Sequence, residues 1–198
     1  MKRNALALLA VAAATLPLSG CISLSPKPPA RLMTLAATTP LAAGTAITTG
    51  DKEAVQIARL SAIPALQTQR VLVTDGATAI AYLKDGLWSA QPTELFRGLL
   101  AETITVRTGR VVTEPRQLQI QPDTKLAGQI SAFGLDGPGR SVTVTFDAAL
   151  SHDGSDQIQS RRFSAHLPVA SEQPEAIAAA LNQAANQVAG EVADWIGK

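Results

Sequence analysis

The chain contains a single cysteine, Cys21, which directly follows an apolar N-terminal segment. One thiol cannot form an intramolecular disulfide, so the folded chain must be held together by side-chain packing. Apolar residues make up 46% of the sequence, the share found in ordinary globular domains. The sequence therefore predicts a globular domain that depends on its hydrophobic core for stability.

Residues 1–20 have the three parts of a secretory signal peptide. Lys2 and Arg3 provide the charged start, residues 4–16 form an apolar stretch, and small residues precede Cys21. The apolar stretch is too short for a bilayer core of ~30 Å, which needs roughly 20 residues. We expect cleavage between Gly20 and Cys21.

The sequence Leu-Ser-Gly-Cys at residues 18–21 resembles the bacterial lipobox. In a lipobox the cysteine thiol receives a diacylglyceryl group, signal peptidase II cuts just before it, and the new amine is often acylated. An ordinary secretory signal with a chance cysteine is the alternative. The spacing and the small residues favour the lipobox, so Cys21 is the predicted lipid attachment site. No other cofactor is expected.

The segment after the cysteine predicts a tether and then one domain. Residues 21–30 are rich in proline, and an extended conformation would reach about 25–30 Å at roughly 3 Å per residue. Residues 31–198 form the predicted single globular domain. Loss of Lys2 and Arg3 takes the formal net charge from +1 to −1, which argues against a nucleic-acid partner.

Hydrophobic patterning predicts an α+β fold. Short strands are expected at residues 32–35 and from residue 55 to near Pro64, and Asp75-Gly76 predicts a hairpin turn. Helices are expected at 92–108, with Gly109 as the stop, and at 174–196. Three further strands are expected at residues 126–135, 142–150 and 158–167. Strands grouped in hairpins indicate a mostly antiparallel or mixed sheet with both helices packed on one face.

The sequence offers little for catalysis. The two histidines, His152 and His166, lie beside a turn and on a strand. His152 and Asp153 could be drawn as metal ligands, but no third ligand stands at a suitable spacing. No nucleophile elbow or phosphate-binding glycine loop is present in the sequence. We expect neither a catalytic site nor a metal site.

Several segments together resemble the ABC-type transport auxiliary lipoprotein family, typified by the PqiC-like lipoproteins. The resemblance covers most of residues 31–198, and the segments that carry it are Val55–Ile57, Ile63–Leu66, Arg70–Val73, Tyr82–Trp88 and the Leu95–Ile104 part of the first helix. Such proteins are implied to be non-enzymatic partners of ABC transporters whose substrate-binding component carries an MCE (mammalian cell entry) domain and moves lipids. They are implied to sit on the periplasmic side of the outer membrane. Ile22 agrees with this location, because the sorting rule of enteric bacteria retains lipoproteins with aspartate there in the inner membrane.

A surface around Pro64, Leu66 and Trp88 is the predicted partner site, since tryptophan is enriched at interfaces. Core packing is the competing explanation for Trp88. A lipid-binding carrier and a structural envelope lipoprotein are the alternatives to the accessory subunit. The sequence also leaves a homo-oligomer open.

Overall fold

One long strand, β6 (Thr124–Asp136), organises the sheet in the computed structural model, which describes residues 31–114, 120–138 and 140–197. The predicted signal peptide, Cys21 and the tether lie outside the described residues. Along one edge β6 pairs antiparallel with β7 (Ser141–His152), and β7 pairs antiparallel with β8 (Ile158–Pro168). These are the three long strands that the sequence predicts. Alternate side chains of β7 are buried, beginning with Val142, Val144 and Phe146, as expected for a sheet with one covered face.

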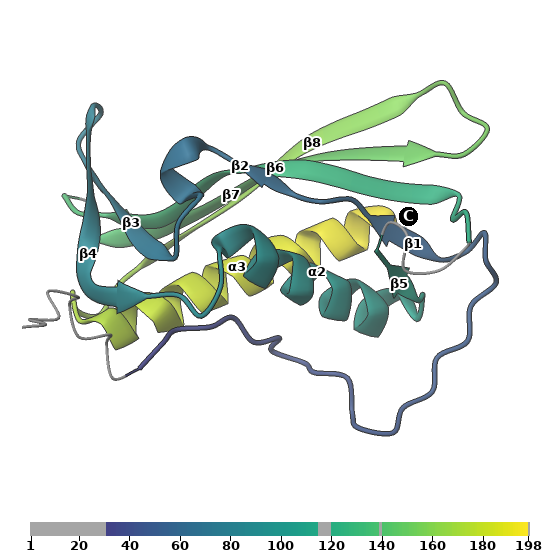
Figure 1. The fold of residues 1–198 in the computed structure, drawn as a ribbon, viewed down its shortest axis with the longest axis horizontal. Coiled ribbons are helices and arrows are strands. Elements are labelled where there is room, and N and C mark those ends of the chain that lie inside the picture. The colour runs from purple at the N-terminus through teal and green to yellow at the C-terminus, as the bar shows by residue number, and fades with distance from the viewer. Residues whose placement is uncertain (1–30, 115–119, 139, 198) are drawn as a thin grey trace, which may run out of the picture.

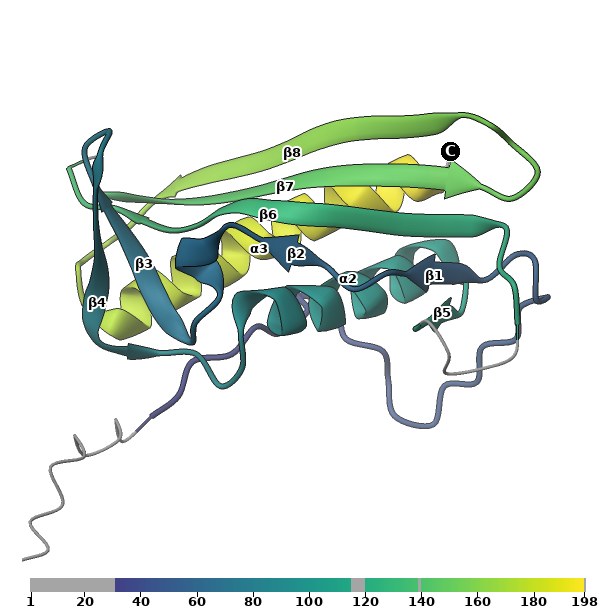
Figure 2. The ribbon, with the colours of Figure 1, turned by 45° about the horizontal axis from the view of Figure 1, so that its top comes forward.

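Three short strands lie end to end along the other edge of β6, all parallel to it (Figure 2). They are β1 (Val55–Ile57), β2 (Ser61–Ala62) and β3 (Arg70–Asp75). The single strand expected from residue 55 to near Pro64 is therefore two strands with a break between them. Between β2 and β3 the chain leaves the sheet as a short 3-10 helix, η1 (Pro64–Leu66).

A further row of strands flanks this edge. β3 forms the predicted hairpin with β4 (Ala79–Leu87), and β1 pairs parallel with β5 (Val112–Thr113). Among the described residues, β2 pairs with β6 alone. The outer row is thus interrupted opposite β2.

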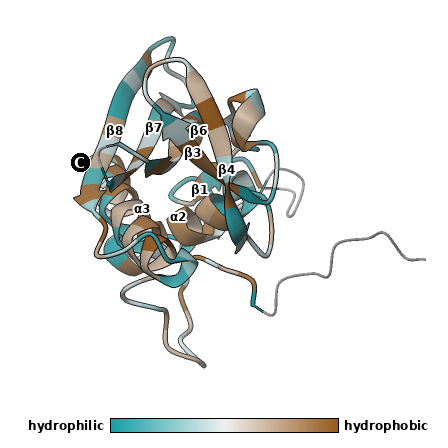
Figure 3. Cartoon of the chain, turned by 90° about the vertical axis from the view of Figure 1, so that its left-hand side faces the viewer, coloured by the Kyte–Doolittle hydropathy of each residue, from teal (hydrophilic) through white to brown (hydrophobic). Residues whose placement is uncertain are grey.

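Two helices cover one face of the sheet, as the sequence predicts (Figures 1 and 3). The first, α2 (Pro92–Thr108), begins with proline and ends at Gly109, whose φ of 68° lies in the left-handed region that favours glycine. The second is α3 (Pro174–Ile196). Leu99 of α2 and Leu181 of α3 are both buried in the core. The core between helices and sheet includes Phe96, Phe133, Phe146, Phe163 and Ile177, all at most 1% exposed.

Residues 31–50, here called the strap, run across the helices on the side away from the sheet (Figure 1). The expected strand at residues 32–35 is wrong: it amounts to a single bridge between Met33 and Trp88. Elsewhere the strap bonds to side chains of α2 and α3, including Glu102, whose Oε1 accepts from the Leu41 N–H at 3.0 Å. Residues 34–38 therefore lie against helices, where no neighbouring strand is available to complete a ladder.

Candidate functional site

The predicted partner surface is wrong at two of its three residues. Trp88 is fully buried and packs edge-to-face on Phe133, with ring centroids 5.5 Å apart. Leu66 is fully buried as well. The backbone explains the position of Trp88, since its N–H bonds to the Gln69 carbonyl while the strap pairs alongside it. The tryptophan joins three segments from inside the core and presents no surface to a partner.

Pro64 is exposed, and the residues on either side of it line an apolar depression in the outer face of the sheet. The depression has a volume of about 160 Å³, with Ile63 and Ala65 at one side and Ile80 at another. Ile80 is 58% exposed. Pro64 therefore lies beside an accessible surface. The neighbouring residues on that surface are Ile63, Ala65 and Ile80, and not the predicted Leu66 and Trp88.

The two histidines do not form a site together. His166 lies opposite Thr143 near the start of β7, and its Nδ1 is 3.0 Å from the threonine hydroxyl. His152 is the last residue of β7, with Nδ1 3.5 Å from Thr124 Oγ1. Over residues 31–114, 120–138 and 140–197, no group of three His, Cys, Asp or Glu side chains could hold a metal ion.

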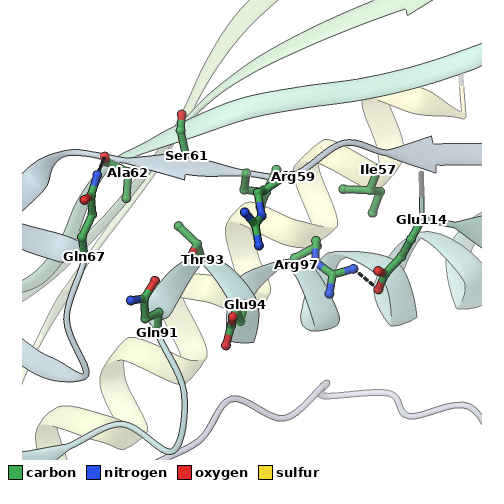
Figure 4. Close-up of a pocket in the computed structure, with 11 residues that line it drawn as sticks. Ile57, Arg59, Ser61, Ala62, Gln67, Gln91, Thr93, Glu94, Arg97 and Glu114 are labelled. Atoms are coloured by element: carbon green, nitrogen blue, oxygen red, sulfur yellow. Dashed lines mark hydrogen bonds and ion pairs between the residues drawn. The ribbon is translucent and has the colours of Figure 1, made fainter. Parts of the chain in front are cut away.

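A groove of about 870 Å³ lies between the β1–β2 edge and the beginning of α2 (Figure 4). Most side chains around it are polar or charged, which suits a peptide or another polar ligand better than an acyl chain. An ion pair between Arg97 and Glu114 bounds it on the β5 side. The lining residues are Ile57, Arg59, Leu60, Ser61, Ala62, Gln67, Gln91, Thr93, Glu94, Arg97 and Glu114.

Gln67, directly after η1, reaches back into this groove. Its Nε2 donates to the carbonyl of Ala62 at 3.3 Å, so the side-chain amide stands where a neighbouring strand would donate (Figure 4). Sequence reasoning missed the groove, because its walls come from segments that are brought together only by the parallel pairing of β1 and β2 with β6.

Arg110 clamps the end of the sheet beside β1 and β6. Its Nε donates to the Glu53 carbonyl at 2.5 Å, and one Nη donates to Thr124 Oγ1 at 2.7 Å and to the Ala54 carbonyl at 3.4 Å. Burial lowers the pKa of Arg110, opposed by the nearby charge of Glu53. Arginine stays protonated in proteins, so the clamp is a charged, structural contact.

A second arginine pairs on the outer face of the sheet. Arg162 on β8 donates to both carboxylate oxygens of Asp147 on β7, at 2.5 and 3.2 Å. The hydrogen bond from Arg162 lowers the pKa of Asp147, and the same contact raises the pKa of Arg162. Asp147 is therefore engaged in a cross-strand pair and is not directed toward either histidine.

The sequence of this α+β domain matches the model of a known family. The chain belongs to the ABC-type transport auxiliary lipoprotein components, whose family model matches residues 34–193. The family resemblance drawn from the sequence is therefore confirmed. Comparison with curated proteins gives no match.

Solved structures share the fold. Protein XCC0632 from Xanthomonas campestris, assigned to family DUF330, is 22% identical with a TM-score of 0.70, over 84% of this chain and 94% of its own. A second structure, of an uncharacterized protein, is 16% identical with a TM-score of 0.65, over 84% of this chain and 99% of its own. At these identities the similarity establishes the fold alone. In the part of the chain that the structure describes, no helix is long and apolar enough to span a membrane.

Proposed function

We propose that this protein is a lipid-anchored, non-enzymatic accessory subunit of an ABC transporter whose substrate-binding component carries an MCE domain and moves phospholipids. Membership of the auxiliary lipoprotein family over residues 34–193 is the observation that carries the proposal. The lipobox-like sequence ending at Cys21 supports the anchor. Tethering both partners to one envelope raises their effective concentration, so a weak contact suffices for docking.

The proposed location is the periplasmic side of the outer membrane, supported by Ile22 after the lipidated cysteine. Two or three acyl chains, at about 0.8 kcal/mol per buried methylene, would anchor the chain firmly. Cys21→Ser should abolish both the acyl mass and membrane fractionation. Ile22→Asp should shift the protein to the inner-membrane fraction. A Cys21→Ser protein that kept its acyl mass would refute lipidation at this residue.

Docking is a better account than lipid carriage, because the interior between sheet and helices is occupied by fully buried aromatic side chains such as Phe96 and Phe146, whose rings lie 5.3 Å apart. The groove beside β2 has a mostly polar lining. Mass spectrometry of lipids extracted from the purified protein distinguishes the two functions. Stoichiometric lipid that survives delipidation of the anchor would favour the carrier.

Capture of a defined partner tests the proposal directly. The full-length protein, purified from membranes in detergent, should bind the MCE-domain subunit encoded with the same transporter. It should not bind an MCE-domain subunit from an unrelated transporter, which serves as the control. Absence of any complex with the cognate subunit, together with a permeability defect in the deletion strain, would indicate a structural envelope lipoprotein instead.

A further inference from the structure

We propose that the groove between β2 and α2 binds an extended segment of the transporter partner, which adds to the sheet as a short strand at the free edge of β2. The inference rests on the proposed function, since that function supplies the partner. It specifies which surface of the chain is used and the chemistry of recognition. The occupant is a polypeptide backbone in an extended conformation.

The row of strands outside β6 is interrupted beside β2. β1 has β5 on its outer side and β3 has β4, but β2, among the described residues, has no strand on that side. The gap is internal, with a strand at either end of it. A short segment seated there would complete the row, which is how sheet edges commonly recruit extended peptides.

The backbone groups along β2 face β6 and the groove in turn. The Ile63 N–H donates to the Ile130 carbonyl of β6 at 3.3 Å, so the groups of Ile63, and those of Ser61 two residues earlier, face β6. Backbone groups alternate sides along a strand. Leu60 and Ala62 therefore present their N–H and carbonyl groups to the groove.

Gln67 already bonds to the outer edge of β2. Its side-chain amide donates to the Ala62 carbonyl at 3.3 Å, in the position of a strand partner. This contact shows that the carbonyl is directed into the groove and within reach of a donor there. An incoming backbone N–H can replace the glutamine amide with no change in the sheet.

The opposite wall belongs to the first turns of α2, where Thr93 is half-buried and Gln91 is exposed. Their polar side chains can hydrogen-bond to the edge of a bound peptide that faces away from β2. The outer edge of β8 is different from the edge of β2. It carries Arg161 and Arg162, and charged side chains on an edge strand discourage strand addition.

The test uses the full-length protein in detergent with the cognate MCE-domain subunit. On binding, exchange of the Leu60 and Ala62 amides should slow by about tenfold or more, because strand addition protects the backbone groups that face the groove. Residues 160–164 of β8 serve as the internal control and should be unchanged. Unchanged exchange of the Leu60 and Ala62 amides in a formed complex would overturn strand addition while leaving the proposed function intact.

A matched pair of variants tests the groove itself. Thr93→Trp fills it from α2 and should weaken binding of the subunit by about tenfold or more, whereas Ala179→Trp adds the same side chain to an exposed site on α3 and should not. Equal affinity of Thr93→Trp and the wild type would overturn the groove as the site. If the wild type forms no complex, the proposed function itself fails. Should Thr93→Trp not fold, the exchange measurement on the wild type decides alone.

Discussion

Asn182 and Asn186 lie one turn apart on α3, and both side-chain amides bond to the backbone of the strap. Asn182 Oδ1 accepts from the Ala36 N–H at 2.9 Å, and Asn186 Oδ1 accepts from the Thr38 N–H at 2.8 Å. Asn186 Nδ2 also donates to the Ala36 carbonyl at 2.9 Å. An amide offers both a donor and an acceptor, so it can bond to an extended backbone much as a strand does. Because the two asparagines lie one turn apart on the same side of α3, they fix the position of the strap at Ala36 and Thr38.

Asn186→Ala removes two of these three contacts. We expect a loss of about 1–2 kcal/mol in the free energy of unfolding, at roughly 1 kcal/mol for each hydrogen bond. Amide exchange at Thr38 should accelerate more than in the helices. Gln187→Ala is the control, because that exposed side chain bonds only to Glu191 on its own helix, at 3.2 Å, among the contacts of the described residues. Equal exchange at Thr38 in the two variants would contradict this role of Asn186.

Arg110→Ala should destabilise the domain by about 2–3 kcal/mol, since hydrogen bonds from a charged group contribute more than neutral ones. The loss leaves the carbonyl of Glu53 and the hydroxyl of Thr124 without their donor. Chemical denaturation measures the effect. In comparison, Arg140→Ala should change stability by less than about 0.5 kcal/mol, because its contact with Glu172 spans 4.0 Å between two exposed side chains.

The Asp147–Arg162 pair predicts a pH dependence of stability. Arg162 lowers the pKa of Asp147 below its ordinary value of 3.8, so the folded state binds the proton less tightly than the unfolded state. The stabilisation is present above about pH 4 and is lost as pH falls through the lowered pKa. Arg162→Gln should therefore reduce stability at pH 7 and have a smaller effect at pH 2. If the stability difference between Arg162→Gln and the wild type is the same at pH 7 and pH 2, the prediction is contradicted.

Local patterns were sufficient for the elements that have a clear period or a clear stop signal. Pro92 and Gly109 bound α2 as predicted, and β7 contains the strand predicted at residues 142–150. Both helices could be placed on one face because the strands come in hairpins. The family resemblance rested in part on the segment that forms α2, and the family model confirms it.

Long-range pairing could not be predicted from the sequence. Val55 pairs with Thr124 across almost seventy residues, and neither residue carries a local signal of that register. The same pairing produces the groove, so the site was missed together with the topology. Trp88 was placed on a partner surface because tryptophan suits both interfaces and cores, and its burial depends on the strap and the Gln69 loop meeting around it.

Gly134 marks a place where β3 approaches β6 too closely for any side chain. A Cβ at this position would lie 2.3 Å from the Leu72 carbonyl oxygen, so the backbone itself would have to move. Gly134→Ala should destabilise the domain by about 1–3 kcal/mol, the usual cost of overpacking. Gly98→Ala on α2 is the control, since nothing lies within 4 Å of its Cβ position. It should stabilise by about 0.5–1 kcal/mol, because alanine is the better helix former. The melting temperature measures both effects. A higher melting temperature for Gly134→Ala than for Gly98→Ala would contradict both predictions.

Replacement of both histidines tests the non-enzymatic proposal. His152 and His166 are both exposed. His152 is the last residue of β7, whereas His166 lies on β8, opposite Thr143 near the start of β7. His152→Ala with His166→Ala should change stability by less than about 0.5 kcal/mol per site. The double variant should restore the envelope barrier of a deletion strain as fully as the wild type does, measured by sensitivity to a detergent. Cys21→Ser, which lacks the proposed anchor, should fail in the same assay. A double variant that is folded and membrane-bound but fails to restore the barrier would point to chemistry at the histidines, and with it to an enzymatic function.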